Sequence, residues 1–570
     1  MKQRIESLLR HALEAAVADG ELALDEIPTP FVERPRDPSH GDWATNVAMQ
    51  LAKPAKLAPR RIAEIIADRI AEDPDIAAVE IAGPGFINLR LSGEALRGVL
   101  REAREQGPEF GHVNIGQGTK VQVEFVSANP VGPMHVGHGR WAALGDSLAR
   151  VLEATGYEVE REFYINDAGV QMDIFAKSVA GRYLELAGPA ETIEFGEDWY
   201  RGAYITDIAR EILEADGKKW VGVPAAEREA AFKERAYAQV LAHLQKVLHD
   251  MGVDFDVWFS ERTLHEPGPD GKSAIDRVIE KLRAEGYIYD HEGAVWFRTT
   301  TFGDDKDRVL KKADGSYTYF AADIAYHEDK LERGFELIVD IWGADHHGYV
   351  RRMEAAVCAL GSPGALEVII GQLVNLFRNG EVVRMSKRTG EMVTFEDLID
   401  EVGDDAARYF FLRRSTDQAL DFDIGLAKEQ SADNPVYYVQ YAHARICSIL
   451  RKAAGRDTAD ETADIAAIAA ARIPGDAPLE LLDSDAELTL LRKLAELPEV
   501  VEATARGRAP HRLTAYAEDL AATFHRFYTL CRVVSEDEAL TAARLFAVDA
   551  TRIALANVLG LIGVNAPQRM

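Results

Sequence analysis

The chain has 570 residues, several times the length of an ordinary domain, so more than one hydrophobic core is expected. Hydrophobic residues make up 47% and charged residues 28%, a balance that excludes a largely disordered or collagen-like protein. The formal net charge of −29 opposes indiscriminate binding to polyanions, so any contact with a nucleic acid has to use local basic patches.

The compartment is predicted from patterns that the sequence lacks. No stretch approaches the roughly 18 uninterrupted apolar residues of a membrane span, and the opening MKQRIESLLRHALEAA carries charges where a signal peptide has its apolar run. Cys358, Cys447 and Cys531 lie far apart, which indicates neither a disulfide framework nor a thiolate zinc site. We therefore expect a cytoplasmic protein that does not bind a membrane.

Residues 1–111 are expected to form a separate α+β unit. An amphipathic opening helix is followed by a helix near 59–72 and by VEIAGPGFINLRL, whose alternation around Gly-Pro-Gly predicts a strand or hairpin. The glycine-rich link EQGPEFGHVNIGQG is a plausible domain boundary.

Residues 112–430 are expected to form a Rossmann-type catalytic core, because KVQVEFVSA, a glycine turn and a helical segment open a nucleotide-binding α/β unit. The strand-like runs EVEREFYI, FELIVDIWGA and ALEVIIGQLV predict a mostly parallel sheet. Residues from about 170 to 300 are rich in helix and charge and are expected to be an insertion. Residues 431–570 have helical periodicity and predict an all-α bundle, in which the acidic stretch from Asp457 to Glu487 is either a loop or an exposed helical pair.

The strongest local motif is the turn PVGPMHVGHGR, which contains His135, Gly137 and His138 between a predicted strand and a predicted helix. Glycine allows the backbone to approach a ligand closely, and the N-terminus of the following helix offers free N–H groups to phosphate. The alternative is that these are two solvated loop histidines without a function.

Downstream, Arg384-Met385-Ser386-Lys387-Arg388 lies in a glycine-flanked basic loop, where the Lys387 ammonium is suited to phosphate oxygens. Alone, such a loop is more often plain surface.

Together the two motifs resemble the HIGH and KMSKS signatures of class I aminoacyl-tRNA synthetases, with Arg384 in place of the first lysine. The resemblance to arginyl-tRNA synthetases extends over essentially the whole chain. It is carried by ATNVAMQLAK, GPGFINLRL, EFVSANPVGPMHVGHGR, FYINDAGVQM, YTYFAADIAYH, IWGADHHGY, RMSKRTG, NPVYYVQYAHARICSIL and FHRFYTLCRVV.

The resemblance implies an arginine-tRNA ligase that uses ATP and Mg²⁺ to form arginyl-adenylate and transfers arginine to tRNA(Arg), with tRNA needed for activation. His135, His138 and Lys387 are then the catalytic residues, and ATP is expected to contact Gly137, Gly343, Asp345, His346, Met385 and Ser386. The arginine pocket is expected to contain Glu124, Asn129, Tyr319, Asp323 and His347. Carboxylates suit a planar guanidinium, and Tyr319 and Asp323 lie four apart, on one face if that segment is helical. Asp345, His346 and His347 are metal-ligand types, but adjacent residues rarely converge on one ion, so no metal site is predicted.

Contacts with tRNA are expected at Tyr437 and Tyr441, which could stack on splayed anticodon bases, and at Phe86 and Asn88 in the N-terminal unit. For each tyrosine, an aromatic core stripe is an equally good interpretation. The resemblance implies a monomer and no binding to DNA. Local basic patches are expected at Arg408, Arg413, Arg414, Arg445, Arg451, Lys452, Arg506, Arg508 and Arg512.

Two other functions fit parts of the pattern. A small-molecule nucleotidylyltransferase shares the H-x-G-H turn, but it does not require a long helical C-terminal region. A regulatory RNA-binding relative without activity would keep the fold, but the intact His135, His138 and Lys387 disfavour it. Pyrophosphate exchange with each amino acid, with and without tRNA, separates the three hypotheses.

Overall fold

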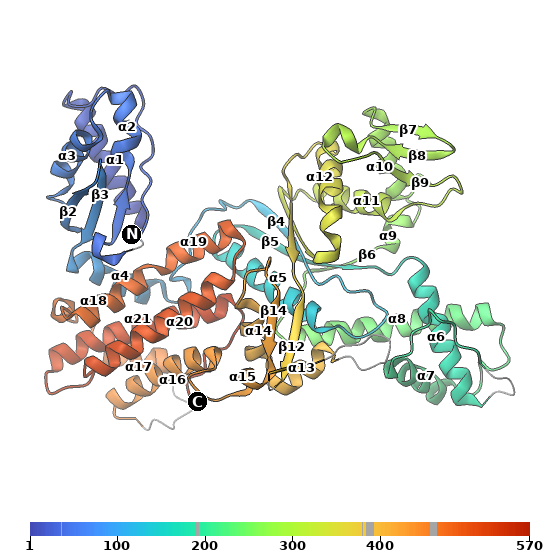
Figure 1. Cartoon of the computed structure of the whole chain (residues 1–570). Helices are drawn as coiled ribbons and strands as arrows, with labels where there is room; N and C mark the ends of the chain where they lie inside the picture. The colour runs from blue at the N-terminus through green and yellow to red at the C-terminus, as the bar shows by residue number, and fades with distance from the viewer. Residues whose placement is uncertain (36, 189–192, 379, 384–392, 457–463) are drawn as a thin grey trace.

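The computed structural model describes residues 1–570 except 36, 189–192, 379, 384–392 and 457–463. Figure 1 shows an N-terminal unit standing above a long helical bundle, a central parallel sheet beside the bundle, and two further lobes beyond the sheet. The predicted α/β class, with its parallel core and its helical C-terminal region, is confirmed. None of the described helices is long and apolar enough to cross a membrane.

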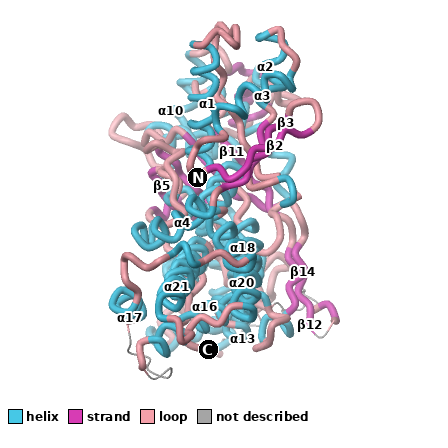
Figure 2. Tube along the Cα trace, turned by 90° about the vertical axis from the view of Figure 1, so that its left-hand side faces the viewer, coloured by secondary structure: helices cyan, strands magenta, loops and turns pink. Residues whose placement is uncertain are grey.

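The N-terminal unit is a three-stranded antiparallel sheet, in the order β1-β3-β2, that packs against helices. Its elements are α1 (Lys2–Ala18), β1 (Trp43–Thr45), α2 (Val47–Ala55), α3 (Pro59–Ile70), β2 (Ile76–Ala82) and β3 (Phe86–Leu91). Helix α4 (Gly93–Gln106) follows and packs against the bundle. Two ion pairs fix the unit to the bundle, Arg34–Glu499 at 2.6 Å and Asp42–Arg492 at 2.8 Å. Figure 2 shows the unit above the bundle helices.

The central sheet has five parallel strands in the order β11-β10-β4-β5-β6. They are β4 (Lys120–Glu124), β5 (Glu158–Ile165), β6 (Val257–Ser260), β10 (Leu337–Gly343) and β11 (Leu366–Gly371). Helix α5 (Val136–Ala154) follows β4. The chain leaves β4 toward β5 on one side and returns to β10 on the other, so a crevice opens between β4 and β10 at their carboxyl ends. Parallel sheets bind ligands at such switch points.

Two segments interrupt the sheet. Between β5 and β6 lie α6 (Val170–Ala187), α7 (Ala203–Asp216) and α8 (Ala225–Asp250). Between β6 and β10 lie α9 (Arg262–His265), α10 (Ala274–Ala284), β7 (Ile288–His291), β8 (Ala294–Phe297), β9 (Arg308–Lys311) and α11 (Tyr319–Glu332). Strands β7 to β9 form a small antiparallel sheet that the sequence analysis did not predict. Strands of four residues offer too few alternating positions to be recognised from periodicity.

The remaining elements connect the sheet to the bundle. After α12 (Val350–Ala359) come β12 (Val374–Arg378), β13 (Glu381–Val382), α13 (Phe395–Val402), α14 (Asp404–Leu412), β14 (Leu420–Asp423) and α15 (Ile424–Lys428). The bundle contains α16 (Pro435–Ala453), α17 (Ile465–Arg472), α18 (Asp485–Ala495), α19 (Leu497–Gly507), α20 (His511–Leu530) and α21 (Glu538–Leu561). The acidic stretch from Asp457 to Glu487 was predicted to be either a loop or an exposed helical pair. Its described residues form α17, a short 3-10 turn and the start of α18.

Arg408 on α14 joins three parts of the molecule. Its guanidinium contacts the Asp146 carboxylate on α5 and donates to the carbonyl oxygens of Met251 at 3.0 Å and Ile562 at 3.1 Å. The side chain is 1% exposed, so the expectation that Arg408 forms part of an RNA-facing basic patch is wrong. Arg451, also 1% exposed, is excluded for the same reason. A single sequence does not reveal that these cations satisfy internal carbonyl groups.

We predict that Arg408→Met lowers the free energy of unfolding by about 3 kcal/mol or more, because a buried carboxylate and two carbonyl groups lose their donor. Urea unfolding of the two proteins measures the difference. Arg413→Met is the matched control, since the half-exposed Arg413–Glu518 pair should contribute less than about 1 kcal/mol. Equal losses in both variants would contradict the prediction.

Candidate active site

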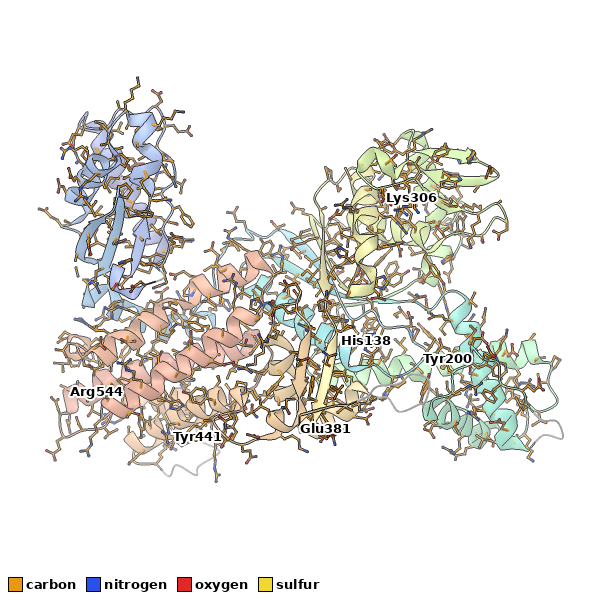
Figure 3. All side chains as sticks on the ribbon, viewed as in Figure 1. His138, Tyr200, Lys306, Glu381, Tyr441 and Arg544 are labelled. Carbon is orange, nitrogen blue, oxygen red and sulfur yellow. The ribbon has the colours of Figure 1, made fainter. Side chains whose placement is uncertain are left out.

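A cavity of about 1230 Å³ opens at the carboxyl ends of the central strands. It contains most of the described residues that the sequence analysis selected. The lining includes Glu124, Asn129, His135, Gly137, His138, Tyr319, Asp323, Gly343, Asp345 and His346. Figure 3 shows His138 near the centre of the molecule, between the strands and the helical lobe.

The phosphate-type turn is built from the first residues of α5. His135 is the N-cap residue, its backbone N–H donates to His138 Nδ1 at 3.2 Å, and the two imidazole rings stack with their centroids 3.7 Å apart. A side chain at Gly137 would place its Cβ 2.9 Å from the His135 ring, so glycine is needed to keep the stack. The turn therefore presents two imidazoles beside the positive end of a 19-residue helix.

The second basic motif cannot be assigned contacts, because Arg384, Met385, Ser386 and Lys387 lie outside the described residues. The segment that follows them is fixed beside the histidines. His135 pairs with Thr394 in an antiparallel bridge, and the Phe395 N–H donates to the Met134 carbonyl at 2.9 Å. The described chain after residue 392 therefore runs beside the first motif.

Two carboxylates also line the cavity. Glu124, at the end of β4, is 7% exposed and accepts from Ser127 Oγ at 2.9 Å and from Lys330 Nζ at 2.7 Å. Burial raises the pKa of Glu124, and the Lys330 ammonium opposes this change.

Asp323 lies one turn into α11 and accepts a hydrogen bond from the Tyr349 hydroxyl. No described lysine or arginine forms an ion pair with this carboxylate. Burial raises its pKa to about 6, although the Tyr349 hydrogen bond acts in the opposite direction. A half-buried carboxyl group that no described lysine or arginine pairs with thus lines the cavity, where a cationic ligand would stabilise its charged form.

The other predicted pocket residues are more open. Tyr319 is 68% exposed at the mouth, and exposed Asn129 donates to Gln171 at 3.0 Å. Gly343 ends β10, and Asp345 and His346 follow it in a 3-10 turn that borders the cavity. His347 lies in the same turn but is not among the described residues that line the cavity.

Sequence reasoning missed several side chains behind and beside the pocket. Lys330 and His327 lie on the same face of α11 as Asp323, and both contact Asp340 of β10, at 2.9 and 3.0 Å. Two sequence features could have indicated these residues. Asp323, His327 and Lys330 are spaced four and three residues apart, as on one helix face, and Asp340 is a charged residue inside the apolar run LIVDIW. Their pairing depends on strand register, which a single sequence does not give.

The predicted RNA-contacting residues lie far from this cavity along the fold. The rings of Tyr437 and Tyr441 on α16 are parallel, with centroids 6.1 Å apart, and the Arg445 guanidinium lies 5.0 Å from the Tyr441 ring. Both tyrosines are half-buried. In the N-terminal unit Phe86 is 38% exposed, whereas Asn88 is 7% exposed, so only the phenylalanine offers a substantial surface.

Three family models match consecutive parts of the chain. Residues 3–91 match the arginyl tRNA synthetase N terminal domain, residues 105–424 match the catalytic domain of class I (R) tRNA synthetases, and residues 439–570 match the DALR anticodon binding domain. The catalytic match covers the cavity and both motifs.

Similar proteins extend over the full length. The chain is 50% identical to an arginine-tRNA ligase of Desulfitobacterium hafniense, covering 99% of this chain and 98% of that protein. It is 49% identical to the arginine-tRNA ligase of Moorella thermoacetica, covering 100% and 99%. The Thermus thermophilus arginyl-tRNA synthetase structure superposes with a TM-score of 0.75 at 22% identity over 100% of both chains, which supports the fold. With the histidine turn at the crevice of a parallel sheet, a catalytic-domain match over residues 105–424 and such similarity along its whole length, the chain belongs to the arginyl-tRNA synthetase family of class I aminoacyl-tRNA synthetases.

Proposed function

We propose that this protein activates L-arginine with ATP, forming arginyl-adenylate and pyrophosphate, and transfers the arginyl group to the terminal adenosine of tRNA(Arg). The observation that carries the choice of amino acid is Asp323, a carboxylate on the cavity wall that has a hydrogen-bond donor but no ion pair with a described cation. Glu124, at the end of strand β4, supplies a second carboxylate that lines the cavity. A guanidinium offers the charge and the multiple donors that such a pair accepts.

The proposed chemistry uses positioning and charge stabilisation rather than a covalent nucleophile. The arginine carboxylate attacks the α-phosphorus of ATP, and pyrophosphate leaves. His135 and His138 stabilise the charge that develops on the α-phosphate, and Lys387 stabilises the leaving pyrophosphate. The bridge between His135 and Thr394 supports this cooperation, because Thr394 lies only seven residues after Lys387 in the sequence.

ATP is proposed to lie along the helix α5 side of the cavity, with Gly343, Asp345 and His346 beside the adenosine and Gly137, Met385 and Ser386 near the phosphates. Mg²⁺ is proposed to enter with the phosphates, which commonly supply ligands to this ion. Among the described residues no three potential ligand side chains gather in one place, so the pocket is not proposed as a separate metal centre. The ion would neutralise phosphate charge.

We further propose a role for each part of the chain. The N-terminal unit, residues 1–111, contacts the outer corner of the tRNA. Residues 112–430 form the catalytic domain, and residues 431–570 bind the anticodon. The stacked pair Tyr437 and Tyr441, with Arg445 beside it, combines aromatic faces with a positive charge, as binding of unpaired bases requires. Phe86 is the proposed contact of the N-terminal unit, because Asn88 is buried, and Tyr319, Asn129 and His347 are those proposed at the mouth of the arginine pocket. A cytoplasmic monomer stays a prediction.

The first test of the active site is His138→Ala. We expect arginine-dependent pyrophosphate exchange to slow by roughly 10² to 10³, the usual effect of losing one preorganised transition-state donor, with the arginine KM little changed. His11→Ala, at an exposed position on α1, is the control. Unchanged turnover in His138→Ala would remove the histidine from the mechanism.

The second test is Asp323→Asn. Because this change removes the charge facing the guanidinium, we expect the arginine KM to rise about 10- to 100-fold with a much smaller effect on ATP. Asp329→Asn, on the same helix but paired with Arg333 at 2.9 Å, is the matched control. Equal losses for arginine and ATP would indicate a structural role instead.

The raised pKa of Asp323 predicts how kcat/KM for arginine depends on pH. Since the pKa of Asp323 is about 6 in the unliganded pocket, kcat/KM for arginine should be constant above that value and fall as the pH drops through it. The neutral side chain of Asp323→Asn should remove this contribution. A wild-type profile retained in the variant would assign the titration to another group.

We also propose that tRNA is needed for activation. Gln440, between the two stacked tyrosines on α16, donates to Asp405 on α14 at 2.8 Å, and Arg408 on α14 contacts Asp146 of α5. Docking on the bundle could therefore bias the position of the helix that carries His135 and His138, through a population shift.

Tyr441→Ala tests this coupling. We expect slower exchange at subsaturating tRNA and recovery of most of the rate at saturating tRNA, because the loss of a stacked ring weakens binding by about 1 to 3 kcal/mol. Tyr441→Phe keeps the ring and should behave like the parent. Full-speed exchange by the parent without tRNA would refute the coupling while leaving the ligase activity intact.

A further inference from the structure

The face of the central sheet beneath α11 is polar rather than apolar. Strand register sets Asp340 of β10 opposite Glu124 of β4, and Glu124 opposite Glu162 of β5. These three carboxylates form a row across neighbouring strands, and each is at most 7% exposed. Like charges at such positions repel one another, so the row requires cations from the helix that covers it.

Helix α11 supplies those cations at helical spacing. Lys330 is 0% exposed, and its ammonium donates to Glu124 Oε2 at 2.7 Å and to Asp340 Oδ1 at 2.9 Å. Arg333, one turn later, donates to Glu162 at 2.7 Å. Burial disfavours the charged form of Lys330, but the adjacent carboxylates raise its pKa, so the ammonium stays charged near neutral pH.

The two carboxylate oxygens of Glu124 have different hydrogen-bond partners. Oε2 is held by the ammonium on the inner side, whereas Oε1 accepts from Ser127 Oγ at 2.9 Å. Glu124 itself lines the cavity, but Lys330 does not belong to the described lining and lies behind the carboxylate. The lysine can therefore fix the orientation of Glu124 without contacting a ligand.

We propose that Lys330 is a positioning residue for amino-acid selection, which holds Glu124 charged and oriented toward the cationic substrate. This inference rests on the proposed arginine-tRNA ligase function. The charge of Glu124 depends on every group around it, and among the residues that the structure describes Lys330 is the cation in direct contact with its side chain. The other titratable groups facing it are Asp323, Tyr326 and His327 of α11, Asp340 of β10, and Glu162 and Tyr164 of β5.

The test is Lys330→Met, assayed by arginine-dependent pyrophosphate exchange with saturating tRNA from pH 5.5 to pH 9. We expect the arginine KM to rise roughly 10- to 100-fold, as for other residues that orient a ligand-contacting group from behind, while the ATP KM changes little. Because Glu124 loses its cation, the acid limb of kcat/KM for arginine should move to higher pH. A purely structural role would leave that limb in place.

The double variant Lys330→Met/Asp340→Asn separates charge balance from positioning. It removes one positive and one negative charge, so it should recover thermal stability, yet Glu124 still lacks its partner and the arginine defect should persist. If the double variant recovers the parental KM and pH profile, Lys330 serves only to neutralise Asp340 and the proposal fails. If Lys330→Met does not fold, the double variant carries the comparison alone. Asp340→Asn keeps the Lys330–Glu124 pair and measures what loss of this cavity-lining carboxylate contributes by itself. Asp329→Asn, on the same helix as Lys330 and not among the described lining residues, is the control with near-parental arginine KM.

These outcomes are distinct from failure of the proposed function. A parent protein without arginine-dependent exchange would refute the ligase assignment itself. A fully active parent together with a folded Lys330→Met protein of unchanged arginine KM and pH profile would refute the role of Lys330 alone.

Discussion

The position of β4 at the centre of the parallel sheet constrains everything around it. Its side chains alternate between two faces, so Val121 and Val123 pack in the main hydrophobic core while Gln122 and Glu124 face the polar layer under α11. The residues that follow β4 lead directly into the histidine turn of α5. One strand thus carries Glu124 at its end and leads into the histidine turn, so both line the same cavity.

Helices and strands whose pattern lies within a short run of consecutive residues could be predicted from the sequence. The strand at 158–165, the glycine turn before α5 and the helical C-terminal region follow from alternation, turn residues and helical periodicity, and the structure confirms them. The polar layer was not predicted, because Glu124, Asp340 and Lys330 become partners only through strand register and helix packing. Arg408 was misinterpreted for a related reason: a buried arginine that serves carbonyl groups has the same sequence appearance as one that faces RNA.

Charge is managed differently in the two polar regions of the fold. With a formal charge of −29, the chain has carboxylates in excess, and in the layer under α11 the buried Lys330 and the half-buried Arg333 each contact more than one of them. Asp323 is the exception on the cavity side. Among the described residues no lysine or arginine pairs with Asp323, so this carboxylate keeps its charge available to a cationic ligand, while Arg445 lies beside the Tyr441 ring on the bundle.

The junction around Arg408 also has a consequence for how the protein is synthesised. Ser147 on α5 donates to the Leu561 carbonyl across 414 positions of sequence, next to the contact between Arg408 and Ile562. Helix α5 therefore cannot reach its final support until residue 562 has left the ribosome. A nascent chain would carry the complete sheet sequence well before that moment, with its central helix still lacking part of its packing. Such long-range closure favours slow folding and an interval in which the growing chain depends on chaperones.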